Sequence, residues 1–186
     1  ANLEQINVAR KLGANSFTHT FNAMTPLHHR YLNMTGAAMT MDDMFTEVIV
    51  DGIHVNFEMV KILARAKGKK NLVAITDAVS IKGLKPGEHF LKDRHVFIDK
   101  NGIGHLSNGV LAGSSNKMNQ MLHNLIYKAN VDLVTAINSV TSNPANLMGW
   151  KHKGRIAEGL DADIVVVNPA IEVLCTYSRG NHVFQI

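Results

Sequence analysis

The stretch LVAITD, residues 72–77, decides the class of fold. Its five uncharged residues followed by Asp77 are typical of a strand that is buried on both faces and ends at the edge of a parallel sheet. Residues 15–20 have the same form and carry His19 near their end, and residues 46–51 lead into the motif DGIH at residues 51–54. Three strand ends that each carry an ionisable group predict one shared site, because barrel enzymes present catalytic groups at the carboxyl ends of their strands.

Helical periodicity separates these strands. Amphipathic helices are predicted at residues 2–12, 36–44 and 56–66, where apolar residues recur at helical spacing. Gly13 and Gly68 follow the first and third of these helices as stop signals, and Asn56 is expected as an N-cap. The alternation of strands and helices predicts an α/β fold with right-handed crossovers and a parallel sheet.

The sequence after Asp77 predicts a change of architecture. Short alternating segments between Gly- and Asn-containing turn signals predict a small hairpin excursion over residues 88–107. A Met- and Leu-rich helix follows over residues 114–129, and we expect it to pack in the core. Strands at residues 164–167 and 171–174 then indicate a small β domain, with the boundary near residue 150.

Two short helices are predicted between these parts, at residues 132–141 and 143–149. Asp132 and Asn143 are expected as their N-caps, and Pro144 is expected at a first helical position, where its missing N–H costs nothing.

Composition limits the classes of function. With 46% apolar and 18% charged residues, the 186-residue chain is globular and not disordered. Its single cysteine, Cys175, excludes an intrachain disulfide and fits the reducing cytoplasm. The excess of four positive charges lies in clusters without interleaved aromatic residues, which argues against nucleic-acid binding and is compatible with an anionic small substrate. No apolar run approaches the length that crosses a membrane, so no membrane partner is expected.

Several motifs carry a family resemblance. THTFNAM at residues 18–24, followed by HHR at residues 28–30, resembles a signature of the N-acetylglucosamine-6-phosphate deacetylases, which are metal-dependent enzymes of the amidohydrolase superfamily. The resemblance continues in five further segments, which are residues 51–55, 75–78, 111–114, 143–145 and 154–163. The last two of these are shared by many amidohydrolases. It implies part of a TIM-like (β/α) barrel over residues 1–150 and part of a small β-sandwich over residues 151–186.

The resemblance implies roles for the residues at the strand ends. His19 would be a ligand of a divalent metal ion, which the sequence does not distinguish among Zn, Fe, Mn and Co. Asp77 would take a proton from the attacking water and pass it to the leaving amine nitrogen. The structural alternative for Asp77 is a helix N-cap, and for His54 it is a histidine bonded to backbone.

The remaining matched positions would bind an amino-sugar phosphate. Arg30 would bind the phosphate, across the interface of a homodimer, and His54 would polarise the acetyl carbonyl or hold the sugar. The other substrate-binding positions are expected to be Asn22, Ala23, Leu111, Ala112 and Gly113. His28 and His29 receive no role.

The resemblance also implies an upstream half that carries an acidic ligand and another histidine ligand, and the 186 residues do not contain it. His19 alone would hold a metal weakly, because catalytic sites need about three protein ligands. We therefore expect a fragment of a deacetylase whose isolated activity is doubtful. Two alternatives stay open: another amidohydrolase, acting on a cyclic amide or as a deaminase, and a non-catalytic remnant without metal.

Overall fold

A parallel three-stranded sheet organises the larger part of the chain. The computed structural model describes residues 1–91, 94–100, 103–111 and 114–186, which form two compact units: residues 1–75 with 119–186, and residues 76–118. The sheet of the first unit has the order β1-β2-β3, with Phe17 opposite Thr46 and Glu47 opposite Val73. Its strands are β1 (Ser16–Phe17), β2 (Phe45–Ile49) and β3 (Leu72–Ile75).

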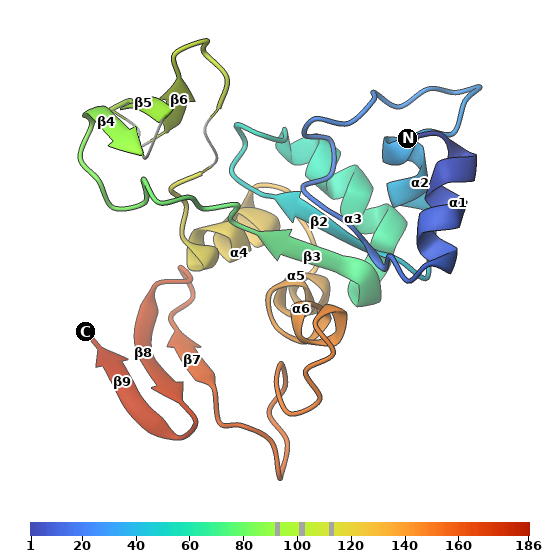
Figure 1. Ribbon diagram of the computed structural model, residues 1–186. Helices are drawn as coiled ribbons and strands as arrows, with labels where there is room; N and C mark the ends of the chain where they lie inside the picture. The colour runs from blue at the N-terminus through green and yellow to red at the C-terminus, as the bar shows by residue number, and fades with distance from the viewer. Residues whose placement is uncertain (92–93, 101–102, 112–113) are drawn as a thin grey trace. The chain divides into compact units, whose positions relative to one another are not determined.

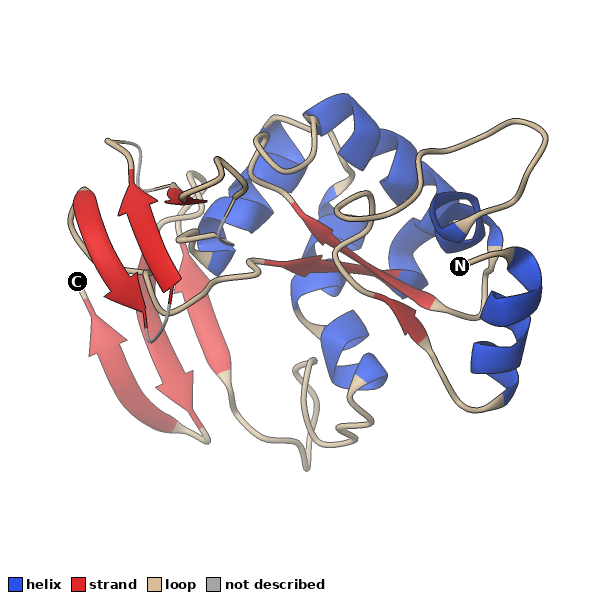
Figure 2. Ribbon diagram, turned by 45° about the horizontal axis from the view of Figure 1, so that its top comes forward, coloured by secondary structure: helices blue, strands red, loops and turns tan. Residues whose placement is uncertain are grey.

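Helices connect and cover these strands, as the alternating pattern predicted (Figures 1 and 2). They are α1 (Leu3–Lys11), α2 (Met34–Thr40) and α3 (Phe57–Asn71). The prediction of a mixed α/β fold with parallel strands is confirmed. Within the part of the chain that the structure describes, the three strands form an open sheet and not a closed barrel.

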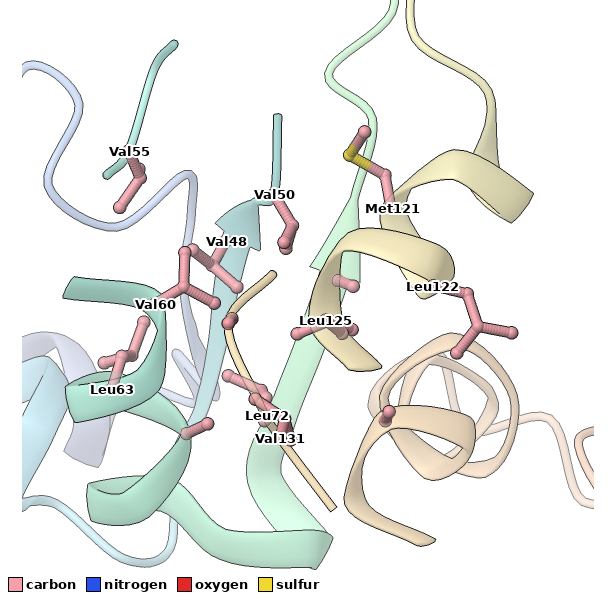
Figure 3. Close-up of a cluster of buried hydrophobic side chains, with 14 of the residues drawn as sticks. Val48, Val50, Val55, Val60, Leu63, Leu72, Met121, Leu122, Leu125 and Val131 are labelled. Atoms are coloured by element: carbon pink, nitrogen blue, oxygen red, sulfur yellow. The ribbon is translucent and has the colours of Figure 1, made fainter. Parts of the chain in front are cut away.

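The main core lies between the sheet and the helices of the first unit. Val48 and Val50 of the β2 segment face Val60 and Leu63 of α3, and all four are fully buried (Figure 3). Met121 and Leu125 of α4 (Met118–Tyr127) belong to the same core, as predicted for the Met- and Leu-rich helix. Burying each of these large side chains contributes about 1.5–3 kcal/mol.

Three helices differ from their predicted bounds. α2 spans Met34–Thr40 and not residues 36–44, because Asn33 caps its start by accepting the Gly36 N–H at 3.2 Å. α3 continues to Asn71, and Gly68 lies inside it with a non-helical backbone (φ 60°, ψ −165°). Gly68 lies at a kink between two helical segments, so it ends the first segment as predicted for a stop signal, and the three residues after it form the second segment. α4 begins at Met118 and not at residue 114, since Ser114 forms a parallel β-bridge with Ala78.

The two short helices are α5 (Leu133–Val140) and α6 (Ser142–Leu147). Asp132 caps α5 as predicted, and its side chain accepts a hydrogen bond from the Thr135 N–H at 3.0 Å. The predicted cap role of Asn143 is wrong. Asn143 lies inside α6, where its side-chain Nδ2 donates to the carbonyls of Leu72 at 2.7 Å and Lys69 at 3.2 Å. Pro144 is accordingly the third residue of the helix and not the first.

A separate antiparallel sheet contains the end of the chain. Its order is β7-β8-β9, and its strands are β7 (Ile164–Val167), β8 (Val173–Ser178) and β9 (Asn181–Gln185). The strand predicted from residue 171 begins later, because Ile171 has a φ of 60° and packs in the main core. The Tyr127 hydroxyl of α4 donates to the Pro169 carbonyl at 2.6 Å and ties this sheet to the helix. A domain division near residue 150 stays a prediction.

The second unit contains the predicted hairpin excursion. An antiparallel sheet of β4 (Gly87–Leu91), β5 (Arg94–Ile98) and β6 (Gly104–Leu106) encloses a small core of Ile81, Val96 and Ile98. Across residues 1–91, 94–100, 103–111 and 114–186, no helix has the length and apolarity needed to cross a membrane.

Candidate active site at the strand ends

Each parallel strand is followed, two residues after its last residue, by an ionisable side chain. These residues are His19 after β1, Asp51 after β2 and Asp77 after β3. The carboxyl ends of parallel strands are where α/β proteins place their ligand sites. His19 and Asp51 belong to the first unit, and Asp77 lies near the start of the second.

The turn after β1 has a strained backbone. His19, Phe21 and Ala23 have φ angles of 32°, 76° and 54°, in the left-handed region that side chains other than glycine rarely adopt. Hydrogen bonds hold the turn in place: the Thr20 N–H donates to the Glu47 carbonyl of β2 at 2.8 Å. Such strain costs about 1–3 kcal/mol per residue and gathers at functional sites. No glycine marks this turn, so sequence periodicity gave no signal for it.

His19 is half-buried at the start of this turn. Its Nδ1 atom is buried and has no hydrogen-bond partner among the described residues. A buried nitrogen without a partner is costly unless a bound group satisfies it, and an imidazole nitrogen is the commonest metal ligand in proteins. His19 therefore fits the role of one metal ligand. In the described ranges, no three His, Cys, Asp or Glu side chains are grouped so that they could hold a metal ion.

Asp51 and His54 form a closely packed pair after β2. The His54 ring nitrogen Nδ1 lies 2.6 Å from Asp51 Oδ2, and Asp51 Oδ1 accepts the backbone N–H groups of Ile53 and His54, each at 2.8 Å. Burial raises the pKa of Asp51, but the hydrogen bonds from His54 and from the two backbone groups outweigh it and leave the pKa below its usual value. Asp51 is therefore a carboxylate at neutral pH.

Asn124 of α4 fastens the end of β2. Its side-chain Nδ2 donates to the Val50 carbonyl at 2.8 Å, and the side chain is buried. A helix distant in sequence thus fixes the residue that precedes Asp51. The sequence showed no signal for this contact, because an Asn in a helix is ordinarily a surface residue.

Asn22 and Ala23 lie in the strained turn. The Asn22 side chain is directed back into it, with Nδ2 donating to the carbonyls of His19 at 3.3 Å and Thr20 at 3.4 Å. Ala23 is exposed.

Arg30 is exposed in the loop that follows, and it makes no ion pair with the described residues. The rings of His28 and His29 stack beside it, with their centroids 4.8 Å apart, and the Arg30 N–H donates to His28 Nδ1 at 3.1 Å. The loop therefore presents a guanidinium next to two imidazoles.

In the second unit, Asp77 is exposed and has a φ of 48°. Its carbonyl accepts the Ser114 N–H at 3.0 Å. The N-cap alternative for Asp77 is wrong, because the next element after it is the strand β4. Leu111 is half-buried and bridges to His105, and the predicted pocket residues Ala112 and Gly113 lie outside the described residues.

Residues 3–183 match the Amidohydrolase family. The chain belongs to the amidohydrolase family. Among curated relatives, this amidohydrolase is 38% identical over 177 residues to the N-acetylglucosamine-6-phosphate deacetylase of Bacillus subtilis, covering 95% of this chain and 44% of that protein. It is 34% identical over 193 residues to the enzyme of the same name from Bos taurus, covering 100% of this chain and 47% of that protein.

Solved structures of that name are similar to this amidohydrolase along its whole length. The N-acetylglucosamine-6-phosphate deacetylase of Thermotoga maritima matches with a TM-score of 0.93 and 34% identity, over 100% of this chain and 51% of that one. A variant of the Mycobacterium smegmatis enzyme in complex with N-acetyl-D-glucosamine-6-phosphate matches with a TM-score of 0.89 and 28% identity. The match covers 98% of this chain and 49% of that one. The chain spans about half the length of the relatives it matches.

The amidohydrolase thus brings some of the predicted site residues together within each unit. In the first unit, His19 and Asn22 share one turn, and the Asp51–His54 pair follows the neighbouring strand. In the second unit, Ser114 joins Asp77 to the segment that contains Leu111. The contacts that sequence reasoning missed are the Asp51–His54 pair, Asn124, and the 2.6 Å hydrogen bond from the Thr18 hydroxyl to Glu47.

Proposed function

We propose that this chain supplies part of the catalytic (β/α) barrel of a metal-dependent deacetylase that converts N-acetylglucosamine 6-phosphate to glucosamine 6-phosphate and acetate. One observation carries the proposal: the solved structure of an enzyme with that name matches the chain along its whole length. The arrangement of the site supports it, because an ionisable residue follows each parallel strand by two positions: His19, Asp51 and Asp77. Residues outside the chain would complete the barrel, as the half-length matches suggest.

A divalent metal fits the chemistry of His19. Amidohydrolases generally use such an ion, and the buried, unpartnered Nδ1 of His19 is a suitable ligand atom. His19 would hold the ion together with ligands from outside this chain, since about three protein ligands are needed. When bound, the ion supplies Lewis-acid polarisation of the amide carbonyl and a lower pKa for the attacking water. Its identity among Zn, Fe, Mn and Co is left open.

The chain's own residues would divide the rest of the work. Asp77, exposed and with a strained backbone, accepts the proton of the attacking water and donates it to the amine nitrogen as the C–N bond breaks. His54 and Asn22 hold the sugar, and Arg30 offers a bidentate fork to the 6-phosphate. Ala23, Leu111, Ala112 and Gly113 would line the substrate pocket.

The assembly and compartment belong to the same proposal. We expect a homodimer in which Arg30 reaches the partner's substrate, because its guanidinium is exposed and has no ion pair with the described residues. The single cysteine fits the cytoplasm. The division into a barrel part over residues 1–150 and a β-sandwich part over residues 151–186 is also proposed.

Acetate release from N-acetylglucosamine 6-phosphate tests this function. The chain is assayed with divalent metal, alone and with a separately produced upstream half of the Bacillus subtilis relative. Asp77→Asn should lower kcat by about 10²–10⁴-fold, whereas Asp132→Asn, which keeps a good helix cap, should leave it unchanged. Absence of activity even with the upstream half would contradict the proposal, and full activity of Asp77→Asn would remove Asp77 from the mechanism.

A further inference from the structure

Glu47, in the middle of β2, contacts the residues on both sides of His19. Its side-chain Oε2 accepts the Thr18 hydroxyl at 2.6 Å, and its main-chain carbonyl accepts the Thr20 N–H at 2.8 Å. One residue of the neighbouring strand therefore holds the chain immediately before and immediately after the residue that we propose as a metal ligand.

The Glu47 side chain lies on the face of β2 that is opposite to α2 and α3. Its two neighbours in the strand face the helices, because Thr46 donates to the Ala38 carbonyl of α2 at 2.9 Å and Val48 packs in the main core. Side chains alternate between the two faces of a strand, so Glu47 is on the other face. Among the described residues, Thr18 is the hydrogen-bond partner of the Glu47 side chain, and no cation pairs with it. The carboxyl group of Glu47 therefore serves the turn after β1.

His19 needs contacts of this kind because its backbone is strained. Its φ of 32° lies in the region that residues other than glycine rarely adopt, and such a conformation persists only where the surrounding contacts enforce it. On the far side of the turn, the Asn22 N–H donates to the His19 carbonyl at 2.9 Å. The backbone conformation sets the direction of the half-buried imidazole, whose Nδ1 has no hydrogen-bond partner in the described ranges.

We propose that Thr18 and Glu47 are positioning residues: the hydrogen bond between their side chains holds His19 in its strained conformation, so that the imidazole already points at the metal position before the ion binds. This inference rests on the proposed function, in which His19 is a metal ligand. The groups that orient a ligand control metal affinity almost as strongly as the ligands themselves. The bond from Thr20 reaches the main chain of Glu47 and survives any side-chain substitution, so the Thr18 hydroxyl is the group to remove.

Three substitutions isolate this hydroxyl. Thr18→Val removes it and keeps the branched shape; because Thr18 is exposed, the change leaves no cavity. Thr18→Ser keeps the hydroxyl and should behave as the wild type. Thr46→Val is the matched control, because it removes a hydroxyl hydrogen bond from β2 on the face that packs against α2. Thr46 is buried, so this control should lower stability more than Thr18→Val but leave metal binding unchanged.

Co²⁺ is the probe, and its binding is followed by visible absorption in the chain reconstituted with the upstream half of the Bacillus subtilis relative. Thr18→Val should weaken Co²⁺ binding by about 10–100-fold, whereas Thr18→Ser and Thr46→Val should not weaken it. In a His19→Gln background, Thr18→Val should cause no further weakening, because Thr18 acts through His19. An unchanged affinity of Thr18→Val overturns the proposal, and so does an equal loss in the His19→Gln background or in Thr46→Val.

Amide hydrogen exchange of the metal-free reconstituted enzyme gives a readout that does not depend on the ion. In Thr18→Val the Thr20 N–H should exchange about 2–12-fold faster, which is the effect of losing one hydrogen bond from the turn, while the Val48 N–H in the core should keep its rate. An unchanged Thr20 rate overturns the positioning role. Co²⁺ binding without release of acetate from N-acetylglucosamine 6-phosphate refutes the proposed function alone, and a wild type that binds no Co²⁺ refutes both.

Discussion

Replacing Asn143 by aspartate distinguishes two roles for its side chain near the start of α6: a helix N-cap, or a buried hydrogen-bond donor. As a helix N-cap, the position would tolerate Asp, since Asp and Asn cap helices about equally well. As the buried donor seen in the structure, it would not. Asn143 is 2% exposed, and its side-chain Nδ2 donates to the carbonyls of Leu72 and Lys69 at 2.7 and 3.2 Å.

The magnitude follows from these two bonds. Each buried hydrogen bond contributes about 0.5–1.5 kcal/mol, so losing both costs about 1–3 kcal/mol. The introduced carboxylate would be buried against two carbonyl oxygens without a donor, which adds about 1–3 kcal/mol. The expected destabilisation of Asn143→Asp is therefore about 2–6 kcal/mol. For a chain of this size that lowers Tm by about 4–24 °C.

Urea unfolding followed by circular dichroism measures this difference at pH 7. Asn146→Asp, at an exposed asparagine of the same helix, is the matched control and should change stability by less than about 1 kcal/mol. The penalty of Asn143→Asp should shrink at lower pH, because burial raises the pKa of the introduced carboxyl and protonation gives it a donor again. A destabilisation below about 1 kcal/mol at pH 7 would refute the bridging role and restore the cap explanation.

Two further predictions concern the β2 end. Gly52→Ala should destabilise the chain more than Gly13→Ala. Both glycines have positive φ angles, but only at Gly52 would the new Cβ meet another side chain, the ring of Phe57 at 2.6 Å. Equal losses of stability in thermal denaturation would contradict this steric argument. The lowered pKa of Asp51 means that its stabilising contribution is present above its unfolded pKa, about 3.9, and is lost as pH falls through the folded value. The stability difference between wild type and Asp51→Asn should therefore diminish from pH 6 to pH 3 in urea titrations, and a difference that grows on acidification would show that the pKa is raised.

The predictable parts of the fold were those governed by local rules. The strand ending at Asp77, the cap at Asp132 and the hairpin excursion over residues 88–107 each depend on a few neighbouring residues, and all three are present. Asn143 has the same local signature as Asp132, yet it is not a cap. Its partners lie more than 70 positions earlier in the chain, so no local pattern could distinguish the two.

The sequence by itself determined which elements form and which ionisable residues follow the parallel strands, because hydrophobic period and turn chemistry act over a few residues. Only the tertiary structure decided the hydrogen-bond state of those residues. The strained turn at His19 needs the backbone of β2, and the carbonyl of Val50 before Asp51 is held by Asn124 of α4. These contacts join segments distant in sequence, and they exist only once the chain has packed.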